Sequence, residues 1–140
     1  MRATKLVSAL DGHGVESIAG ETVLVACPTS IDQARAVLEV ATEHSLRVVP
    51  SGHGTKLGYC RPEVAQGRAD LVLSTRRMNA VVEYVAGDGT LTAQAGACMH
   101  HLAQTVAAGG HRLSPEIPMA QAATLAVSYT HLTLPTILLV

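Results

Sequence analysis

The sequence predicts an α+β fold, built as a β-α-β unit followed by a β-hairpin and a helix. Three short, largely apolar segments, 22–26, 46–49 and 71–74, are typical of strands. A segment with helical periodicity separates the first two. Farther along, Asp88-Gly89 lies between two segments in which polar and apolar residues alternate, which is a strong hairpin signal. The 140 residues are enough for one modest domain.

The predicted helix follows the first strand, which is closed by Cys27-Pro28. Ser30 is a suitable N-cap, and Gln33 three residues later completes a capping box. The helix is expected to end near Ser45. Its spacing predicts one apolar face and one polar face. The residues expected to face the core are Ile31, Ala34, Leu38 and Ala41, and those expected to face solvent are Asp32, Arg35, Glu39 and Glu43.

The second half of the sequence is expected to form the hairpin and a further helix. The hairpin strands are 80–85 and 90–95, and polar residues alternate with Leu and Ala along the second of them, so one face should be solvated. A helix is expected to begin near Met99 and to stop at Gly109-Gly110, because paired glycines commonly end helices.

Composition limits the classes of partner. The net charge is −1 and only 15% of residues are charged, which excludes a basic face for nucleic acid. No apolar run in residues 1–126 approaches the roughly 20 residues needed to cross a bilayer, and no signal peptide is present. We therefore expect a soluble, cytoplasmic protein. Cys27, Cys60 and Cys98 are widely spaced, so we expect buried reduced thiols and no metal site.

Residues 127–140 resemble translated sequencing adapter. The run is uncharged and has no helical or strand period. Val127 to Thr136 can be back-translated as GTC TCT TAT ACA CAT CTG ACG CTG CCG ACG, which matches the pattern of the transposon end and primer tail used in library preparation. A native apolar strand is the alternative, but Pro135 in the middle of the run argues against a strand. The expected organisation is an N-terminal leader at 1–21, part of a domain at 22–126 and a non-native tail at 127–140.

The most informative motif is the glycine-spaced turn 50–58, which directly follows a predicted strand. Gly52 and Gly54 permit positive φ angles and close approach of a ligand. Successive backbone N–H groups in such a turn form a nest that favours phosphate. A Rossmann fingerprint would need glycine where Leu57 stands, and a Walker A loop would need its hydroxyl residue after Lys56 rather than before it. From spacing alone, a tight turn without ligand is an alternative of equal weight.

A series of short motifs runs through residues 22–126 in a specific order and spacing. The motifs are the strand closed by Cys27-Pro28, the helix from Ser30, 49–55, 71–74 with 77–79, 87–96, Gly109-Gly110, Pro118 and 123–125. Together they resemble the PCMH-type FAD-binding domain of the vanillyl-alcohol oxidase and p-cresol methylhydroxylase superfamily. Lys56 followed by 58–62 looks most like the FAD-binding subunit of bacterial glycolate oxidase.

The resemblance implies an FAD site made of two chain segments. Backbone N–H groups of 51–55 would hold the FAD pyrophosphate, after an entry made rigid by Pro50. A second contact would come from the loop 118–125. The implied cofactor-binding residues are Pro50, Ser51, Gly52, His53, Gly54, Thr55, Pro118, Ala123, Thr124 and Leu125. The family pattern continues into Gly-Gly after Leu125, where this chain has Ala126, and an adapter junction inside that codon would explain the departure.

The positions of the histidines argue against covalent attachment of the flavin and against a metal site. Some relatives bond the flavin through a histidine that follows two glycines, whereas His53 lies between Gly52 and Gly54, so we expect non-covalent FAD. His100 and His101 are adjacent on a predicted helix and point about 100° apart, which does not suit one metal ion.

The resemblance also implies what the intact parent does. It would be an FAD-dependent oxidoreductase that oxidises a 2-hydroxy acid such as glycolate, with FAD, a small-molecule substrate and partner oxidoreductase subunits as its partners. No catalytic residue is assigned, because the substrate-binding half would lie downstream. Two alternatives stay open: another oxidase of the superfamily with a different substrate, and a non-catalytic FAD-binding fragment or subunit.

Overall fold

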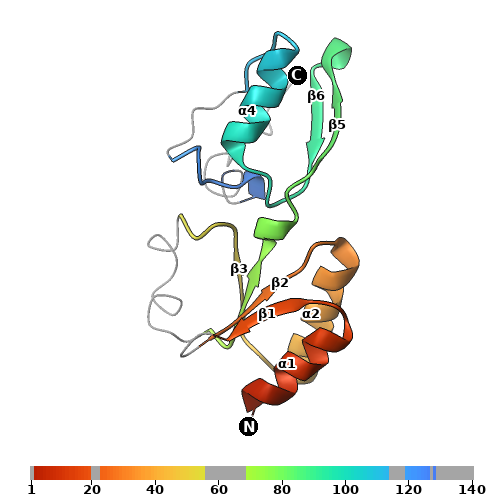
Figure 1. The fold of residues 1–140 in the computed structure, drawn as a ribbon, viewed down its shortest axis with the longest axis vertical. Coiled ribbons are helices and arrows are strands. Elements are labelled where there is room, and N and C mark those ends of the chain that lie inside the picture. Colours follow the sequence, from red (N-terminus) through yellow and green to blue (C-terminus); the bar gives the residue numbers. More distant parts are fainter. Residues whose placement is uncertain (1, 20–22, 56–68, 114–118, 127, 129–140) are drawn as a thin grey trace. The chain divides into compact units, whose positions relative to one another are not determined.

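A computed structural model describes residues 2–19, 23–55, 69–113, 119–126 and 128. The chain divides into two compact units, Met1–Arg77 and Met78–Val140. Each unit combines helix and strand around its own apolar core (Figure 1). This arrangement confirms the predicted α+β class.

The first unit is built on a four-stranded sheet with the order β1-β2-β4-β3. The strands are β1 (Glu16–Ala19), β2 (Leu24–Cys27), β3 (Val48–Ser51) and β4 (Leu71–Ser74). β1 pairs antiparallel with β2, whereas β2 and β3 both pair in parallel with β4. The carboxyl ends of three parallel strands therefore lie along one edge, and ligands of open α/β sheets bind at that kind of edge.

Two helices pack against this sheet, α1 (Arg2–Gly12) and α2 (Ile31–Glu43). Leu10 on α1, Val37 on α2 and Leu71 on β4 are almost fully buried, and each contributes about 1.5–3 kcal/mol by burial. The buried members of this core are Leu6, Leu10, Val15, Leu24, Ala26, Val37, Val40, Ala41 and Leu71. The β-α-β connection from β2 through α2 to β3 agrees with the sequence prediction, and β4 lies between the two strands.

The segment 1–21, expected as a leader, contains α1 and β1. The sequence predicts no element here, because Gly12 and Gly14 interrupt a short and partly polar stretch. Leu6 and Leu10 are four residues apart, so they share one helix face, and that face is buried in the core. Gly14 has a φ of 67° and turns the chain from α1 into β1. These residues are therefore part of the first unit's core.

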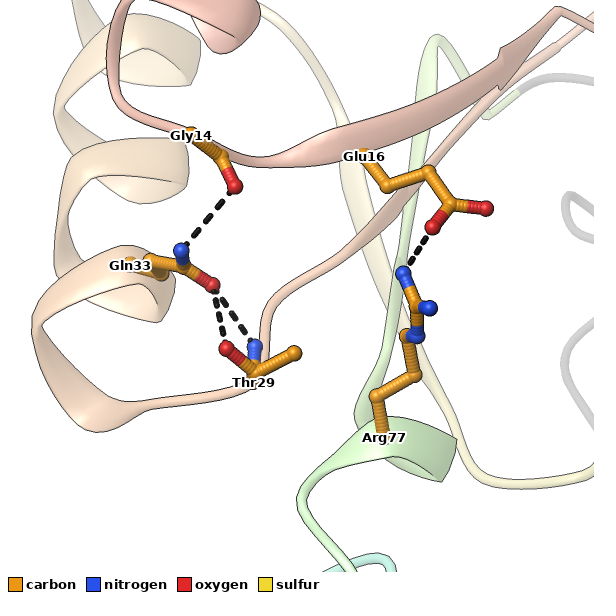
Figure 2. Close-up of polar contacts among 5 residues, drawn as sticks. All are labelled: Gly14, Glu16, Thr29, Gln33 and Arg77. Carbon is orange, nitrogen blue, oxygen red and sulfur yellow. Dashed lines mark hydrogen bonds and ion pairs between the residues drawn. The ribbon is translucent and has the colours of Figure 1, made fainter.

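The start of α2 is held by side chains of its own first turn. Ser30 is the N-cap, and its Oγ accepts a hydrogen bond from Gln33 N at 3.2 Å, as predicted. The Gln33 amide does not close the box on Ser30. Its Oε1 accepts from Thr29 N and Oγ1, and its Nε2 donates to the carbonyl of Gly14 (Figure 2). Gln33 therefore ties the helix start to the turn between α1 and β1.

The buried face of α2 differs from the predicted one. Ile31 is 72% exposed and Leu38 is 46% exposed, although both were expected to face the core. The buried residues are Ala36, Val37, Val40 and Ala41. Apolar residues surround more than half of this helix, so its own periodicity allows several orientations. Packing against α1 and the sheet selects the face centred between Val37 and Val40.

The second unit contains the predicted hairpin and helix. β5 (Val81–Val85) pairs antiparallel with β6 (Thr90–Ala93). They are joined by a 3₁₀ turn, η3 (Ala86–Asp88), and by Gly89 at φ 64°. Helix α4 (Met99–Ala108) follows and is capped by Gly109. Leu91 and Ala93 pack on a core that includes Leu102, which confirms the predicted alternation along β6.

Candidate functional site

The candidate site begins where β3 and β4 end in the first unit. Ser51 and Ser74, the last residues of the two strands, lie opposite each other in the parallel register. Residues 52–55 leave β3 as a bend, and the 3₁₀ turn η2 (Thr75–Arg77) leaves β4. The glycine-spaced turn and η2 are thus neighbours at the carboxyl edge of the sheet.

One glycine of this turn uses the backbone freedom that the sequence suggested. Gly54 has a φ of 79°, whereas Gly52 and His53 are not among the described residues with positive φ. The φ angle thus changes sign between His53 and Gly54, and such a change makes successive N–H groups converge. Gly52, where glycine would also permit a positive φ, does not use this freedom. It is buried, and its carbonyl oxygen lies 3.5 Å from Ser74 Oγ at the end of β4.

The backbone N–H groups of this turn have no acceptors within the described part of the chain. Among the residues that the structure describes, no acceptor engages the N–H of Gly52, His53, Gly54 or Thr55. Gly52 is buried, and Gly54 and Thr55 are half-buried. Buried backbone donors in folded proteins are nearly always paired. Four consecutive free donors at a sheet edge are therefore suited to an anionic ligand.

Hydroxyl groups surround the carbonyls of the same turn. Thr75 Oγ1 donates to the carbonyl oxygen of Ser51 at 3.3 Å. The hydroxyls of Ser51 and Ser74 each lie 3.5 Å from the carbonyl oxygen of Gly52. Ser51 and Ser74 are only 9% and 4% exposed, so these contacts lie beneath the turn and away from solvent.

Positive charge is also present near this edge. Arg76 and Arg77 both lie on η2. Arg77 forms an ion pair with Glu16 of β1 (Figure 2), and Arg76 has no ion-pair partner among the described residues. An exposed arginine on the 3₁₀ turn that follows β4 adds positive charge at this end of the sheet, which favours an anion electrostatically.

A second ion pair joins the opposite ends of β3 and β4. Arg47 Nε and backbone N both donate to Asp70 Oδ2 at 2.9 Å, and Arg47 NH2 donates to Oδ1 at 3.2 Å. The hydrogen bond with Asp70 raises the pKa of Arg47 above its ordinary value. The arginine therefore stays charged through the neutral and alkaline range, and its share of the pair's stabilisation is lost only as the pH rises through the raised pKa. This pair fastens the two strands at the end away from the glycine turn.

The second predicted segment lies in the second unit, beside the start of α4. Thr124 forms an isolated antiparallel bridge with Cys98, and Leu125 N donates to Ala97 O at 2.9 Å. Ala123 is fully buried in the core. Thr124 is 1% exposed, and its Oγ1 has no hydrogen-bond partner among the described residues. A buried hydroxyl without a partner costs about 1–3 kcal/mol, and the hydroxyls of Ser17 and Ser128 share this property in the described part of the chain. Pro118 lies outside the described residues.

The remaining candidate groups are placed as follows. His53, His100 and His101 are exposed. The described part of the chain contains no cluster of three or more His, Cys, Asp or Glu residues that could hold a metal ion. Cys27 is buried and Cys98 is half-buried, both as free thiols, and Cys60 lies outside the described residues. None of the helices that the structure describes is long and apolar enough to span a membrane.

Sequence reasoning missed Ser74 and Thr75. Their role depends on the parallel register of β3 and β4, which places Ser74 opposite Ser51. The available signal was that the predicted strand 71–74 ends in a hydroxyl residue and is followed by another, whereas the strand before the glycine turn was expected to end at Val49 and extends to Ser51.

Comparison with known proteins shows the family to which this chain belongs. The family model described as "FAD binding domain" matches residues 22–126. A D-2-hydroxyglutarate dehydrogenase from Xanthomonas citri pv. viticola is 40% identical over 72 residues, which are 51% of this chain and 15% of that protein.

Solved structures agree at the level of the fold. A glucooligosaccharide oxidase from Acremonium strictum superposes with a TM-score of 0.65 at 19% identity, covering 84% of this chain and 28% of the oxidase. An alkyldihydroxyacetonephosphate synthase superposes with a TM-score of 0.60 at 22% identity, covering 73% of this chain and 19% of the synthase. The matched part therefore spans between 15% and 28% of the length of these proteins.

Proposed function

This chain belongs to the FAD binding domain family, and from that premise we propose that the turn 51–55 holds the FAD pyrophosphate through its backbone N–H groups. The observation that carries the proposal is the run of four consecutive N–H groups, from Gly52 to Thr55, without an acceptor among the described residues. They lie at the carboxyl edge of parallel strands, next to a basic 3₁₀ turn. Each of these features favours a negatively charged phosphate.

The described residues fit this cofactor. The turn carries little side-chain bulk, so phosphate oxygens can approach the backbone. The second segment offers the orphaned hydroxyl of Thr124. When bound, FAD would supply the two-electron acceptor for oxidation of a substrate, and the residues of this chain would bind and orient it.

For the intact protein we propose an FAD-dependent oxidoreductase that acts on a 2-hydroxy acid. The support is the 72-residue match to a D-2-hydroxyglutarate dehydrogenase, together with the glycolate oxidase-like residues 56–62. Glycolate is the proposed example of the substrate class. Another oxidase of the superfamily is the second candidate, because the solved oxidases share the same fold. Partner oxidoreductase subunits are a prediction of the same resemblance, and a cytoplasmic location is a prediction from the sequence composition.

We propose that FAD is bound non-covalently. The glucooligosaccharide oxidase structure is described as revealing a novel flavinylation. In this chain His53 lies between two glycines rather than after them, and its side chain is exposed. Acid precipitation of the flavin-loaded protein should release all yellow colour into the supernatant. Flavin fluorescence that stays with the denatured protein band would contradict the proposal.

The pyrophosphate site is tested by Gly54→Val in the purified 140-residue chain. Valine is strained at a φ of 79°, so FAD affinity should fall by about tenfold or more, measured by quenching of flavin fluorescence. Gly12→Val is the matched control, because a Cβ there meets no atom within 4 Å and the φ is not positive. Equal FAD affinity in Gly54→Val and wild type would overturn the assignment.

A second measurement does not depend on the folding of a variant. ADP, which contains the pyrophosphate, should displace FAD from the wild-type chain, and adenosine should not. Displacement by adenosine at the same concentration as ADP would contradict a site based on phosphate.

The substrate class is tested on the intact protein. D-2-hydroxyglutarate and glycolate are mixed anaerobically with the flavin-loaded protein, and loss of visible flavin absorbance is followed. Reduction by either acid supports the proposal. Reduction by sugars alone would favour the second candidate.

A further inference from the structure

We propose that Ser74 and Thr75 are positioning residues for the pyrophosphate, because their hydroxyls orient two successive peptide groups of the glycine turn. The proposal rests on the proposed FAD function of that turn. It adds two residues of β4 and η2 to a site otherwise made of the backbone of residues 51–55.

The contacts come from one strand end and reach two adjacent carbonyls. Thr75 Oγ1 donates to the carbonyl of Ser51 at 3.3 Å, and Ser74 Oγ lies 3.5 Å from the carbonyl of Gly52. Both hydroxyls approach from the side of β4, which pairs in parallel with β3 up to Ser51. The two carbonyl oxygens therefore point toward β4.

Because the peptide bond is planar, the direction of each carbonyl fixes the direction of the N–H group of the next residue. In a trans peptide group the C=O of one residue and the N–H of the next point in opposite directions. Because Ser51 C=O points toward β4, the N–H of Gly52 points away from it. The same holds for Gly52 C=O and the N–H of His53. Two successive donors of the nest are thus directed to the ligand side.

Burial strengthens the effect of these hydroxyls on the peptide groups that they contact. Ser74 is 4% exposed and Gly52 is buried, so water does not compete freely for the Gly52 carbonyl. Hydroxyls are the side chains able to serve here, since they are small and can donate to a carbonyl beneath a tight turn. Removing Thr75 Oγ1 takes away the hydroxyl that donates to the Ser51 carbonyl. Removing Ser74 Oγ leaves the Gly52 carbonyl with the Ser51 hydroxyl, which belongs to the preceding residue and does not tie that peptide group to β4.

Each of the two hydroxyl side chains therefore sets the direction of one particular backbone N–H group. Thr75 controls the N–H of Gly52, and Ser74 controls the N–H of His53. Thr75→Val keeps the size of the side chain and removes its hydroxyl, Thr75→Ser restores a hydroxyl, and Ser74→Ala removes the hydroxyl of the buried serine.

The test is a titration of the ¹⁵N-labelled 140-residue chain with inorganic pyrophosphate, followed by amide NMR, with FAD affinity measured in parallel. In wild type the amides of residues 52–55 should shift on binding. Thr75→Val should reduce the shift of Gly52 more than that of the other amides, and Ser74→Ala should reduce that of His53. FAD affinity should fall about threefold to tenfold in each, as expected for one hydrogen bond, and return to within about twofold in Thr75→Ser.

Two controls separate positioning from general loss of stability. Thr42→Val removes a hydroxyl that donates to Leu38 O at 2.8 Å within α2, and Ser17→Ala removes a buried hydroxyl without a partner. Both belong to the first unit and should leave FAD affinity and the amide shifts unchanged.

The outcomes distinguish the two proposals. If wild type shows no shifts at residues 52–55, the pyrophosphate assignment fails and the positioning role fails with it. If wild type responds but Thr75→Val and Ser74→Ala respond as wild type does, only the positioning role is overturned. Uniform loss of all shifts in both variants would also overturn it, because it would indicate a structural effect without the predicted pairing.

Discussion

At the residue scale, a few side chains of the first unit form hydrogen bonds with backbone groups and fix the helix start and the glycine turn. Ser30 could be identified as a cap from sequence, because a cap and its helix are adjacent in the chain. Gln33 was identified as its partner, but its contact with Gly14 spans 19 residues and required the packed structure. Ser74 and Thr75 were not identified at all, since their contacts depend on strand register. Local contacts are readable from sequence, whereas contacts across elements are not.

Ser30→Ala and Gln33→Ala should each lower the free energy of unfolding by about 1 kcal/mol, because each removes donors or acceptors from the first turn of α2. The measurement is urea unfolding of the purified chain. Gln104→Ala on the exposed side of α4 is the matched control and should change stability by less than about 0.5 kcal/mol. Equal effects of Gln33→Ala and Gln104→Ala would show that the contacts to Thr29 and Gly14 contribute nothing measurable.

At the scale of elements, most predicted strands and helix ends agree with the structure, and the buried face of α2 does not. Two elements, α1 and β1, were not predicted, and β3 begins two residues later than expected and includes Pro50 and Ser51. Short β-branched runs and glycine stops are local signals, so β4, the hairpin and the end of α4 lie close to where they were expected. The orientation of α2 was wrong because several of its faces are apolar. The sheet and the neighbouring helix α1, which the sequence did not indicate, decide together which face is buried.

The end of α4 yields an element-scale prediction. A Cβ at Gly109 would lie 2.9 Å from Tyr84 Cζ, on the facing strand β5, where Tyr84 also donates to or accepts from His111 Nδ1 at 2.7 Å. Gly109→Ala should therefore destabilise the second unit by about 1–3 kcal/mol. Thermal unfolding by circular dichroism measures the effect.

Gly87→Ala is the control for this prediction, because a Cβ at Gly87 meets nothing within 4 Å. In a Tyr84→Val background the cost of Gly109→Ala should shrink, since the overlapping ring is gone. The same cost in both backgrounds would show that the overlap with Tyr84 is not its cause.

At the scale of the whole molecule, two units share one chain that belongs to the FAD binding domain family. The first unit contains the glycine turn 50–58, and the second contains Thr124, whose hydroxyl has no hydrogen-bond partner among the described residues. The family was recognisable from sequence because its motifs keep a fixed order over residues 22–126. The glycolate oxidase-like assignment, the assigned site residues and the adapter origin of residues 127–140 stay predictions.

The adapter prediction has a direct check. Sequencing the source locus without trimming should find a Gly-Gly pair after Leu125 and a further reading frame of roughly two hundred residues, in keeping with the size of such domains. A native stop codon at that position would contradict it and would favour a short FAD-binding subunit.

The sequence by itself determined the class of fold, the positions of most strands, the glycine turn and the family, because these follow from local propensity and from motifs in a fixed order. Tertiary structure decided which face of α2 is buried, that residues 2–19 complete the core, and that Ser74 and Thr75 lie beneath the turn. The physical reason is that burial and strand register join residues far apart in the chain. No local pattern records which of several apolar faces, or which hydroxyl on a neighbouring strand, will be the one in contact.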